Sequence, residues 1–141
     1  MIQEIERGRV FMGSLERGSD LAAGLTAFCS ENHITLGRIV GLGAVQRANV
    51  GYFDQEDRNY RFIAMDRPLE ITSLVGNVSL KENSPFIHAH VTLGDEEGRG
   101  FGGHLGEGNI VWAFEFTLEE YAGATFERVY DPETKLSLWQ G

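Results

Sequence analysis

Three of the four histidines fall within the segment HAHVTLGDEEGRGFGGHL, residues 88–105. Because side chains alternate between the two faces of a strand, His88 and His90 are expected on one face. A five-residue turn over residues 94–98 would place His88 opposite His104 on the next strand, with Cβ atoms about 5 Å apart. This register predicts three imidazole rings that converge on one point.

A divalent metal ion accounts for such a cluster better than packing does. Protonating one imidazole penalises its neighbours, and burying a ring without a partner costs free energy. A metal ion takes the unprotonated nitrogen lone pairs, and three histidines leave a fourth position for water or a ligand. Zinc is the expected ion, although nickel, copper and ferrous iron also suit imidazole. The alternative is a solvated histidine pair, because a one-residue slip in register would turn His104 to the other face.

Glu115 is the most unusual carboxylate, because it interrupts the apolar run IVWAFEFTL. A carboxyl group buried in such a strand has a raised pKa unless it is paired, which suits a general acid or base. A two-residue loop within GEG, residues 106–108, would place Glu115 on the histidine face, and a three-residue loop would not. Glu115 is therefore the candidate catalytic residue, with an ion pair or a solvent-facing position as the alternatives.

One helix near the N-terminus is expected to support these residues. A strand is expected over residues 9–15, and Ser19 is expected to cap the helix that follows. The apolar stripe of this helix has helical spacing and consists of Leu21, Leu25, Phe28 and Cys29. His33 is expected in the last helical turn, where a positive charge is favourable. The single cysteine is interpreted as a small buried hydrophobic residue.

After the helix the sequence is typical of short strands separated by Gly, Asn, Asp or Pro. The runs rich in β-branched and aromatic residues are 34–45, 48–54, 59–65, 69–80, 86–93, 99–105, 109–118 and 126–131. A second short helix, or an irregular crossover, is expected from Leu118. The acidic run at 95–97 is interpreted as a solvated loop tip. The predicted fold class is α+β, a curved, mainly antiparallel sheet packed with one main helix, in a single domain over residues 1–141.

Composition restricts the classes of function. Twelve basic and 21 acidic side chains give a net charge of -9, which repels a polyphosphate and disfavours DNA binding by this chain alone. No apolar run approaches the ~20 residues that span a bilayer, so no membrane association is expected. The charged N-terminus shows no signal-peptide core, and one cysteine cannot form an internal disulfide. A cytoplasmic location is therefore expected.

Four motifs together resemble the plant and prokaryote conserved (PPC) domain family. They are GLGA at 41–44, RPLEITSLVG at 67–76, HAHVTL at 88–93 and GGHL at 102–105. Their order and spacing match from the opening strand to about Thr117. The resemblance implies an α+β fold with a curved antiparallel sheet, assembled as a homotrimer. It also implies that the strand around Glu70 takes part in partner contacts.

The family is similar in fold to acetolactate decarboxylase, whose metal is held by an HxH pair and a later histidine. Carried over to this chain, the metal ligands would be His88, His90 and His104. The decarboxylase reaction itself is not implied, because its further catalytic residues have no counterpart placed here. Plant members attach AT-hook segments that enter the minor groove, and these 141 residues contain no Arg-Gly-Arg-Pro core.

Two hypotheses follow from the sequence. The first is a metal-binding homotrimer with a zinc centre at the three histidines, which binds a small molecule; whether it is an enzyme is left open. In a reaction, the metal would polarise an oxygen atom or activate water, and Glu115 would move the proton. The second is a noncatalytic assembly module in DNA-linked transcriptional regulation, the role commonly predicted for the family.

Overall fold

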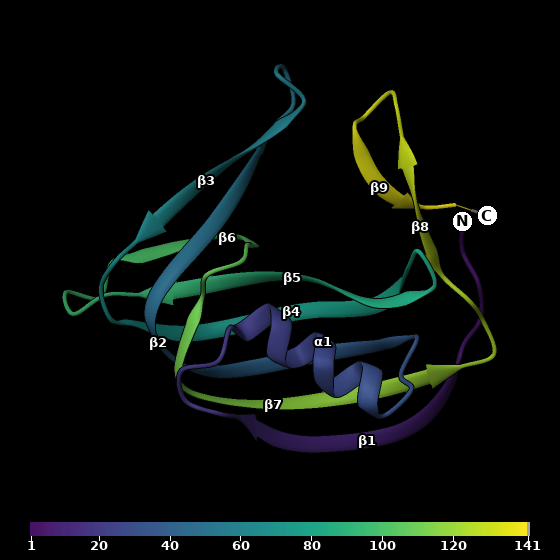
Figure 1. The fold of residues 1–141 in the computed structure, drawn as a ribbon, viewed down its shortest axis with the longest axis horizontal. Helices are drawn as coiled ribbons and strands as arrows, with labels where there is room; N and C mark the ends of the chain where they lie inside the picture. Colours follow the sequence, from purple (N-terminus) through teal and green to yellow (C-terminus); the bar gives the residue numbers. More distant parts are fainter. Residues whose placement is uncertain (141) are drawn as a thin grey trace.

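The computed structural model describes residues 1–140, which form nine strands and one helix (Figure 1). The elements in chain order are β1 (Glu6–Leu15), α1 (Leu21–Glu31), β2 (Gly37–Asp54), β3 (Asn59–Met65), β4 (Leu69–Lys81), β5 (Ser84–Gly94), β6 (Gly100–Leu105), β7 (Ile110–Ala122), β8 (Glu127–Asp131) and β9 (Leu136–Trp139). The predicted α+β class is confirmed.

All nine strands belong to one curved sheet, in the order β1-β7-β2-β6-β5-β4-β8-β9, with β3 paired to β2. The long strand β2 pairs with β4 through its first part and with β6 near its end, so the sheet folds back on itself. Every pairing is antiparallel except that of β8 with β4. Two hairpins, β2–β3 and β8–β9, project from the same side of the sheet (Figure 1).

Helix α1 covers one face of the sheet with the apolar stripe expected from its spacing. Leu21, Leu25 and Cys29 are fully buried. They join a core of sheet side chains that includes Ile39, Val91, Phe114 and Leu118. Burial raises the pKa of the Cys29 thiol to about 12, as expected of a cysteine that acts as a small hydrophobic residue. Among residues 1–140, no helix has the length and apolar character needed to cross a membrane.

The ends of α1 differ from the prediction by one or two residues. Asp20, not Ser19, is the N-cap, and its carboxylate accepts a hydrogen bond from the Ala23 amide at 2.9 Å. The Ser19 hydroxyl instead donates to the carbonyl oxygen of Glu16. His33 lies beyond the helix with a φ of 56°, because the helix ends at Glu31 with Asn32 as its C-cap. Adjacent residues that can all cap compete for this role, so the spacing alone did not decide it.

The strand assignments hold, but several boundaries differ. The runs at 34–45 and 48–54 form the single strand β2, which continues through irregular pairing with β7 near Val45. The prediction of a second helix or an irregular crossover from Leu118 is wrong for residues 118–122: this segment extends β7, where Leu118 pairs with Ile39 of β2. Pairing on both sides outweighs the local helical preference of the glutamates there. The last strand, β9, was not predicted.

Candidate metal centre

His88 and His90 lie on β5, and His104 lies on β6 beside it. The residue opposite His104 is His90, not His88. The predicted pairing is therefore wrong by two residues, because Leu93 pairs with Phe101 and the loop starts one residue later than expected. A shift of two positions keeps every side chain on its face. The expected convergence of the three rings survives this error.

The three rings form a compact cluster. One ligand nitrogen from each histidine lies within 4.8 Å of the other two. The ring centroids are 5.5 Å apart for His88 and His90, 5.1 Å for His88 and His104, and 5.6 Å for His90 and His104. His90 is exposed and the other two are half-buried, so the cluster is reached from one side.

Two glycines before His104 allow β6 to fit between its neighbours. A Cβ atom at Gly103 would come within 2.5 Å of the Gly51 carbonyl oxygen on β2. A Cβ atom at Gly102 would come within 2.8 Å of the Val91 carbonyl oxygen on β5. Glycine is required at such close backbone approaches. The GGHL motif therefore serves to bring His104 up to the histidine pair.

The loop between β5 and β6 is anchored by Asp95, which was expected to be solvated. Its carboxylate is buried and accepts hydrogen bonds from the amides of Glu97 and Arg99, and from Arg99 Nε at 2.8 Å. An Asp side chain that caps its own loop in this way fixes a tight turn. The prediction was wrong for Asp95, since the hydrophilic run gave no sign of which acid folds inward. Glu96 and Glu97 are exposed.

His104 carries a buried ring nitrogen, Nδ1, without a hydrogen-bond partner among the described residues. Its ring lies against Tyr60, with centroids 4.8 Å apart. Burial, with the neighbouring His90 and Arg128, lowers the pKa of His104, so its ring is neutral at pH 7. A buried nitrogen without a partner is costly, and a metal ion would satisfy a free lone pair there.

His88 contacts the guanidinium of Arg128, with Nη2 of Arg128 3.2 Å from Nδ1 of His88. Because a guanidinium can only donate, Nδ1 accepts and the neutral ring carries its proton on Nε2. Burial, together with Arg128, lowers the pKa of His88 to about 4. A metal ion would bind His88 either at Nδ1 in place of this contact, or at Nε2 after the ring proton moves to Nδ1, which then no longer accepts from Arg128.

The donor set fits a transition metal ion. Three imidazoles suit zinc and related divalent ions, and they leave a coordination position for water or a ligand. His88 and His104 need not release a proton to the solvent first, because neither ring is charged at pH 7. The unpartnered nitrogen of His104 and the 4.8 Å grouping are the observations that support this fit.

Glu115 does not join the cluster within one chain. It is exposed on β7, where it pairs with Leu42 of β2 and Ser14 of β1. The hairpin assumed for its placement does not form, because β2 lies between β6 and β7. His104 pairs with Gly51, nine residues beyond Leu42 along β2, which is up to about 30 Å of strand. A catalytic role for Glu115 remains a prediction.

Two residues beside the cluster were missed by the sequence analysis. Tyr60 comes from β3 and Arg128 from β8, which lie outside the histidine segment. Arg128 reaches the site only because β8 adds to the sheet in parallel beside β4. Parallel pairing joins segments far apart in sequence, so no local spacing indicates it. An arginine within the alternating strand ERVYD was the one available signal.

The sequence of this chain matches the model of a known protein family. Residues 2–122 match the model of the Plants and Prokaryotes Conserved (PCC) domain, also abbreviated PPC. The chain belongs to this family. The matched residues include β5 and β6, which carry the three histidines, whereas β8 and β9 lie beyond the matched residues.

Solved structures of PCC proteins share the whole fold. A PPC protein from Pyrococcus horikoshii is 37% identical, with a TM-score of 0.94, and the match covers 100% of this chain and 98% of that one. A metal-containing protein from Archaeoglobus fulgidus is 40% identical with a TM-score of 0.94, covering 100% and 99%. A Bacteroides thetaiotaomicron protein, named as a proposed DNA-binding protein, is 25% identical with a TM-score of 0.86, covering 96% of each chain.

One curated relative is much longer than this chain. It is the bifunctional protein GlmU of Synechococcus sp. (strain JA-3-3Ab), 28% identical over 128 residues. The match covers 89% of this chain and 19% of that protein. The chain thus spans about a fifth of the length of this relative.

Proposed function

We propose that this chain forms a cytoplasmic homotrimer with a zinc or related metal centre at His88, His90 and His104, and that this centre binds a small molecule. The observation that carries the proposal is the buried Nδ1 of His104, which lacks a partner within a group of three converging imidazoles. A metal-containing relative at 40% identity over the full chain supports it.

The bound metal would polarise an oxygen atom of the ligand or lower the pKa of a bound water. The three histidines would hold the metal, and the ring of Tyr60 packs on His104 and restricts its orientation. Exposed His90 leaves the centre open to solvent, so a ligand can enter. Any proton transfer by Glu115 would require a second chain to carry it to the site.

The metal content of protein purified without a histidine tag tests this proposal. We expect about one equivalent of zinc or another transition metal per chain by elemental analysis. A titration of the same sample with duplex DNA, at low and high salt, tests the DNA-binding alternative. We expect no binding, because a net charge of -9 repels the phosphate backbone of DNA. Metal-free protein that does not take up added zinc, or salt-dependent DNA binding, would contradict the proposal.

A homotrimer is supported by apolar side chains on the sheet surface remote from α1. Met12, Leu42 and Val75 have exposed fractions of 85%, 58% and 52%, and they line one hollow there. Contiguous apolar surface of this kind marks protein interfaces in soluble chains. A second and a third copy of the same chain are the proposed occupants, as the resemblance to the family implies.

Replacing Leu42 by glutamate is expected to convert the trimer into a folded monomer. Leu42 is exposed in one chain, so the substitution should cost that chain little stability, whereas a charge at a packed interface is costly. Sedimentation velocity measures the change, with Ile2→Glu, at a fully exposed residue outside the hollow, as the matched control. An unchanged trimer in Leu42→Glu, or a monomeric wild type, would show that this surface is not the interface.

A further inference from the structure

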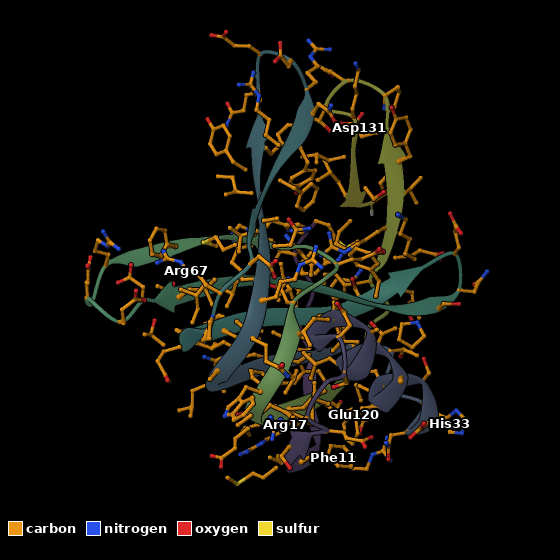
Figure 2. All side chains as sticks on the ribbon, turned by 60° about the vertical axis from the view of Figure 1, so that its left-hand side comes forward. Phe11, Arg17, His33, Arg67, Glu120 and Asp131 are labelled. Atoms are coloured by element: carbon orange, nitrogen blue, oxygen red, sulfur yellow. The ribbon has the colours of Figure 1, made fainter. Side chains whose placement is uncertain are left out.

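A cavity of about 240 Å³ lies directly beside the histidine cluster. The titratable side chains that line it come from β3, β4, β5, β6, β8 and the β8–β9 turn, namely Tyr60, Lys81, His88, His104, Arg128 and Lys135. Both projecting hairpins of Figure 1 contribute to it, β2–β3 through Tyr60 and β8–β9 through Arg128, and Figure 2 shows Asp131 at the far end of β8. The cavity is smaller than the ~300–1,000 Å³ of typical ligand pockets, so it suits a compact ligand.

The charge of this cavity is opposite to that of the chain. Lys81, Arg128 and Lys135 line it, and no acidic residue does so among the residues that the structure describes. The chain as a whole has 12 basic and 21 acidic side chains. A concave site with one sign of charge focuses the electrostatic potential and attracts ions of the other sign.

Arg128 is held in place by neutral groups alone. Its guanidinium donates to the Ser79 hydroxyl at 2.9 Å, the Asn77 side-chain oxygen at 3.0 Å and the Ser137 carbonyl at 3.2 Å. The rings of Phe86 and Trp139 lie 5.5 and 5.2 Å from it. Within residues 1–140, no carboxylate lies within ion-pair distance of Arg128.

Arg128 differs in this respect from the arginines that form ion pairs. Arg9, Arg61, Arg67 and Arg99 each contact an acidic side chain. Arg128 is more buried than Arg9, Arg61 or Arg99, yet it lacks a counterion in the described structure. A half-buried cation without a counterion is unfavourable unless an anion joins it. These contacts and the one to His88 use four of the five N–H groups of the guanidinium, and the remaining Nη1 N–H can donate to an oxygen of a carboxylate or phosphate.

The position of Arg128 links the cavity to the histidines. Its Nη2 atom is 3.2 Å from His88 Nδ1, so the guanidinium is adjacent to a proposed metal ligand. The ring of His104, which carries the unpartnered nitrogen, lines the same cavity. A small ligand in this space can therefore reach Arg128 and the rings of His88 and His104, two of the three that would hold the metal.

We propose that the ligand of this centre is a small oxyanion, a carboxylate or phosphate, that is bound by Arg128 at the open position of the metal. Lys81 and Lys135 add to the attraction without a fixed contact. This inference rests on the proposed function for the metal, but the binding of the anion by Arg128 is a separate property. Arg128 and Lys135 lie beyond residues 2–122, outside the matched PCC domain.

The competing explanation is that Arg128 only fastens the β8–β9 hairpin to β4. Its bonds to Ser79 and Asn77 of β4 and to Ser137 of β9 would serve this purpose. Such an anchor requires no anion and assigns no role to Lys135, which is exposed and contributes only its backbone amide to the hairpin turn. The two explanations therefore differ in what Lys135→Gln should do.

Calorimetric titrations of the full chain with inorganic phosphate and with acetate test the proposal. Each anion is added to the metal-free protein and to the zinc-loaded protein, for the wild type, Arg128→Gln and Lys135→Gln. Arg61→Gln is the matched control, because Arg61 is an exposed arginine on β3 that does not line the cavity. Circular dichroism of each variant verifies that it remains folded.

We expect zinc-loaded wild type to bind at least one of the two anions, with a Kd below about 10 mM. Arg128→Gln should weaken this binding about tenfold or more, Lys135→Gln about two- to threefold, and Arg61→Gln not at all. Tighter binding of phosphate or of acetate shows which oxyanion is preferred. If Arg128→Gln is unfolded, the test is the two- to threefold loss of anion affinity expected in Lys135→Gln.

Zinc binding without any anion binding would overturn the inference and leave the metal centre intact. Equal anion affinity in the wild type and folded Arg128→Gln, or in the wild type and Lys135→Gln when Arg128→Gln is unfolded, would also overturn it. Absence of zinc binding would instead count against the proposed function, and the titration of metal-free protein would still test the contact with Arg128. The two failures are therefore distinguishable.

Discussion

Replacing His104 by alanine is expected to lower the affinity for zinc by about 100-fold or more. This histidine is on β6, whereas the other two are on β5, so its loss leaves a pair that cannot enclose the ion. Two imidazoles also hold zinc less tightly than three, because each ligand bond contributes to the binding free energy. Competition with a coloured chelator at pH 7 measures the affinity.

The fourth histidine provides a matched control for this experiment. His33 is exposed, lies just beyond α1 and takes no part in the cluster. Its positive φ favours asparagine as the replacement, so His33→Asn should keep both fold and zinc affinity. His90→Ala removes an exposed ligand at low structural cost and should lower the affinity for zinc as much as His104→Ala does. Wild-type zinc affinity in His104→Ala and His90→Ala would remove both residues from the metal site.

Replacing Gly43 by alanine is expected to destabilise the protein by about 3 kcal/mol or more. Gly43 has a φ of 151°, which L-residues rarely adopt. A Cβ atom there would lie 2.1 Å from the Ala113 carbonyl oxygen and 2.8 Å from the Phe114 Cα atom on β7. Because both are backbone atoms, relief requires β2 and β7 to separate around the buried ring of Phe114.

Urea-induced unfolding followed by circular dichroism measures this loss. Gly100→Ala is the matched control, because a Cβ atom there would meet nothing within 4 Å and should change stability by less than about 0.5 kcal/mol. If Gly43→Ala unfolds at the wild-type midpoint, the close approach of β2 and β7 is not as the structure has it. A loss of about 3 kcal/mol in Gly43→Ala would show that the GLGA segment at 41–44 is a packing motif that lets β2 and β7 approach closely.

The histidine cluster could be predicted from sequence because side chains alternate between the two faces of a strand, so a register error of an even number of residues does not change the face. An error of two residues in register exchanged His88 for His90 opposite His104 and still left all three rings on one face. The same reasoning failed for Glu115, since its face was inferred from a hairpin between β6 and β7 that does not form. Local alternation indicates which residues share a face, but not which strands are neighbours.

The remainder of the site depends on pairings between distant segments. Arg128 enters through the parallel contact of β8 with β4, and Tyr60 through the hairpin that β3 forms with the end of β2. The burial of Asp95 depends on the amides of Glu97 and Arg99 in its own loop and on the Arg99 side chain. In the sequence these residues are only a run of charged side chains, with no sign of which one is buried. These features follow from tertiary structure, so the spacing of residue types could not indicate them.

Anomalous X-ray diffraction at the zinc edge, on crystals of untagged protein grown with added zinc, would locate a metal ion at the three histidines. We expect a peak about 2.0–2.1 Å from one nitrogen of each of His88, His90 and His104. A difference map would also show whether an oxyanion bridges that peak and Arg128. No peak among the three rings, with zinc bound elsewhere or not at all, would show that these histidines do not form a metal centre.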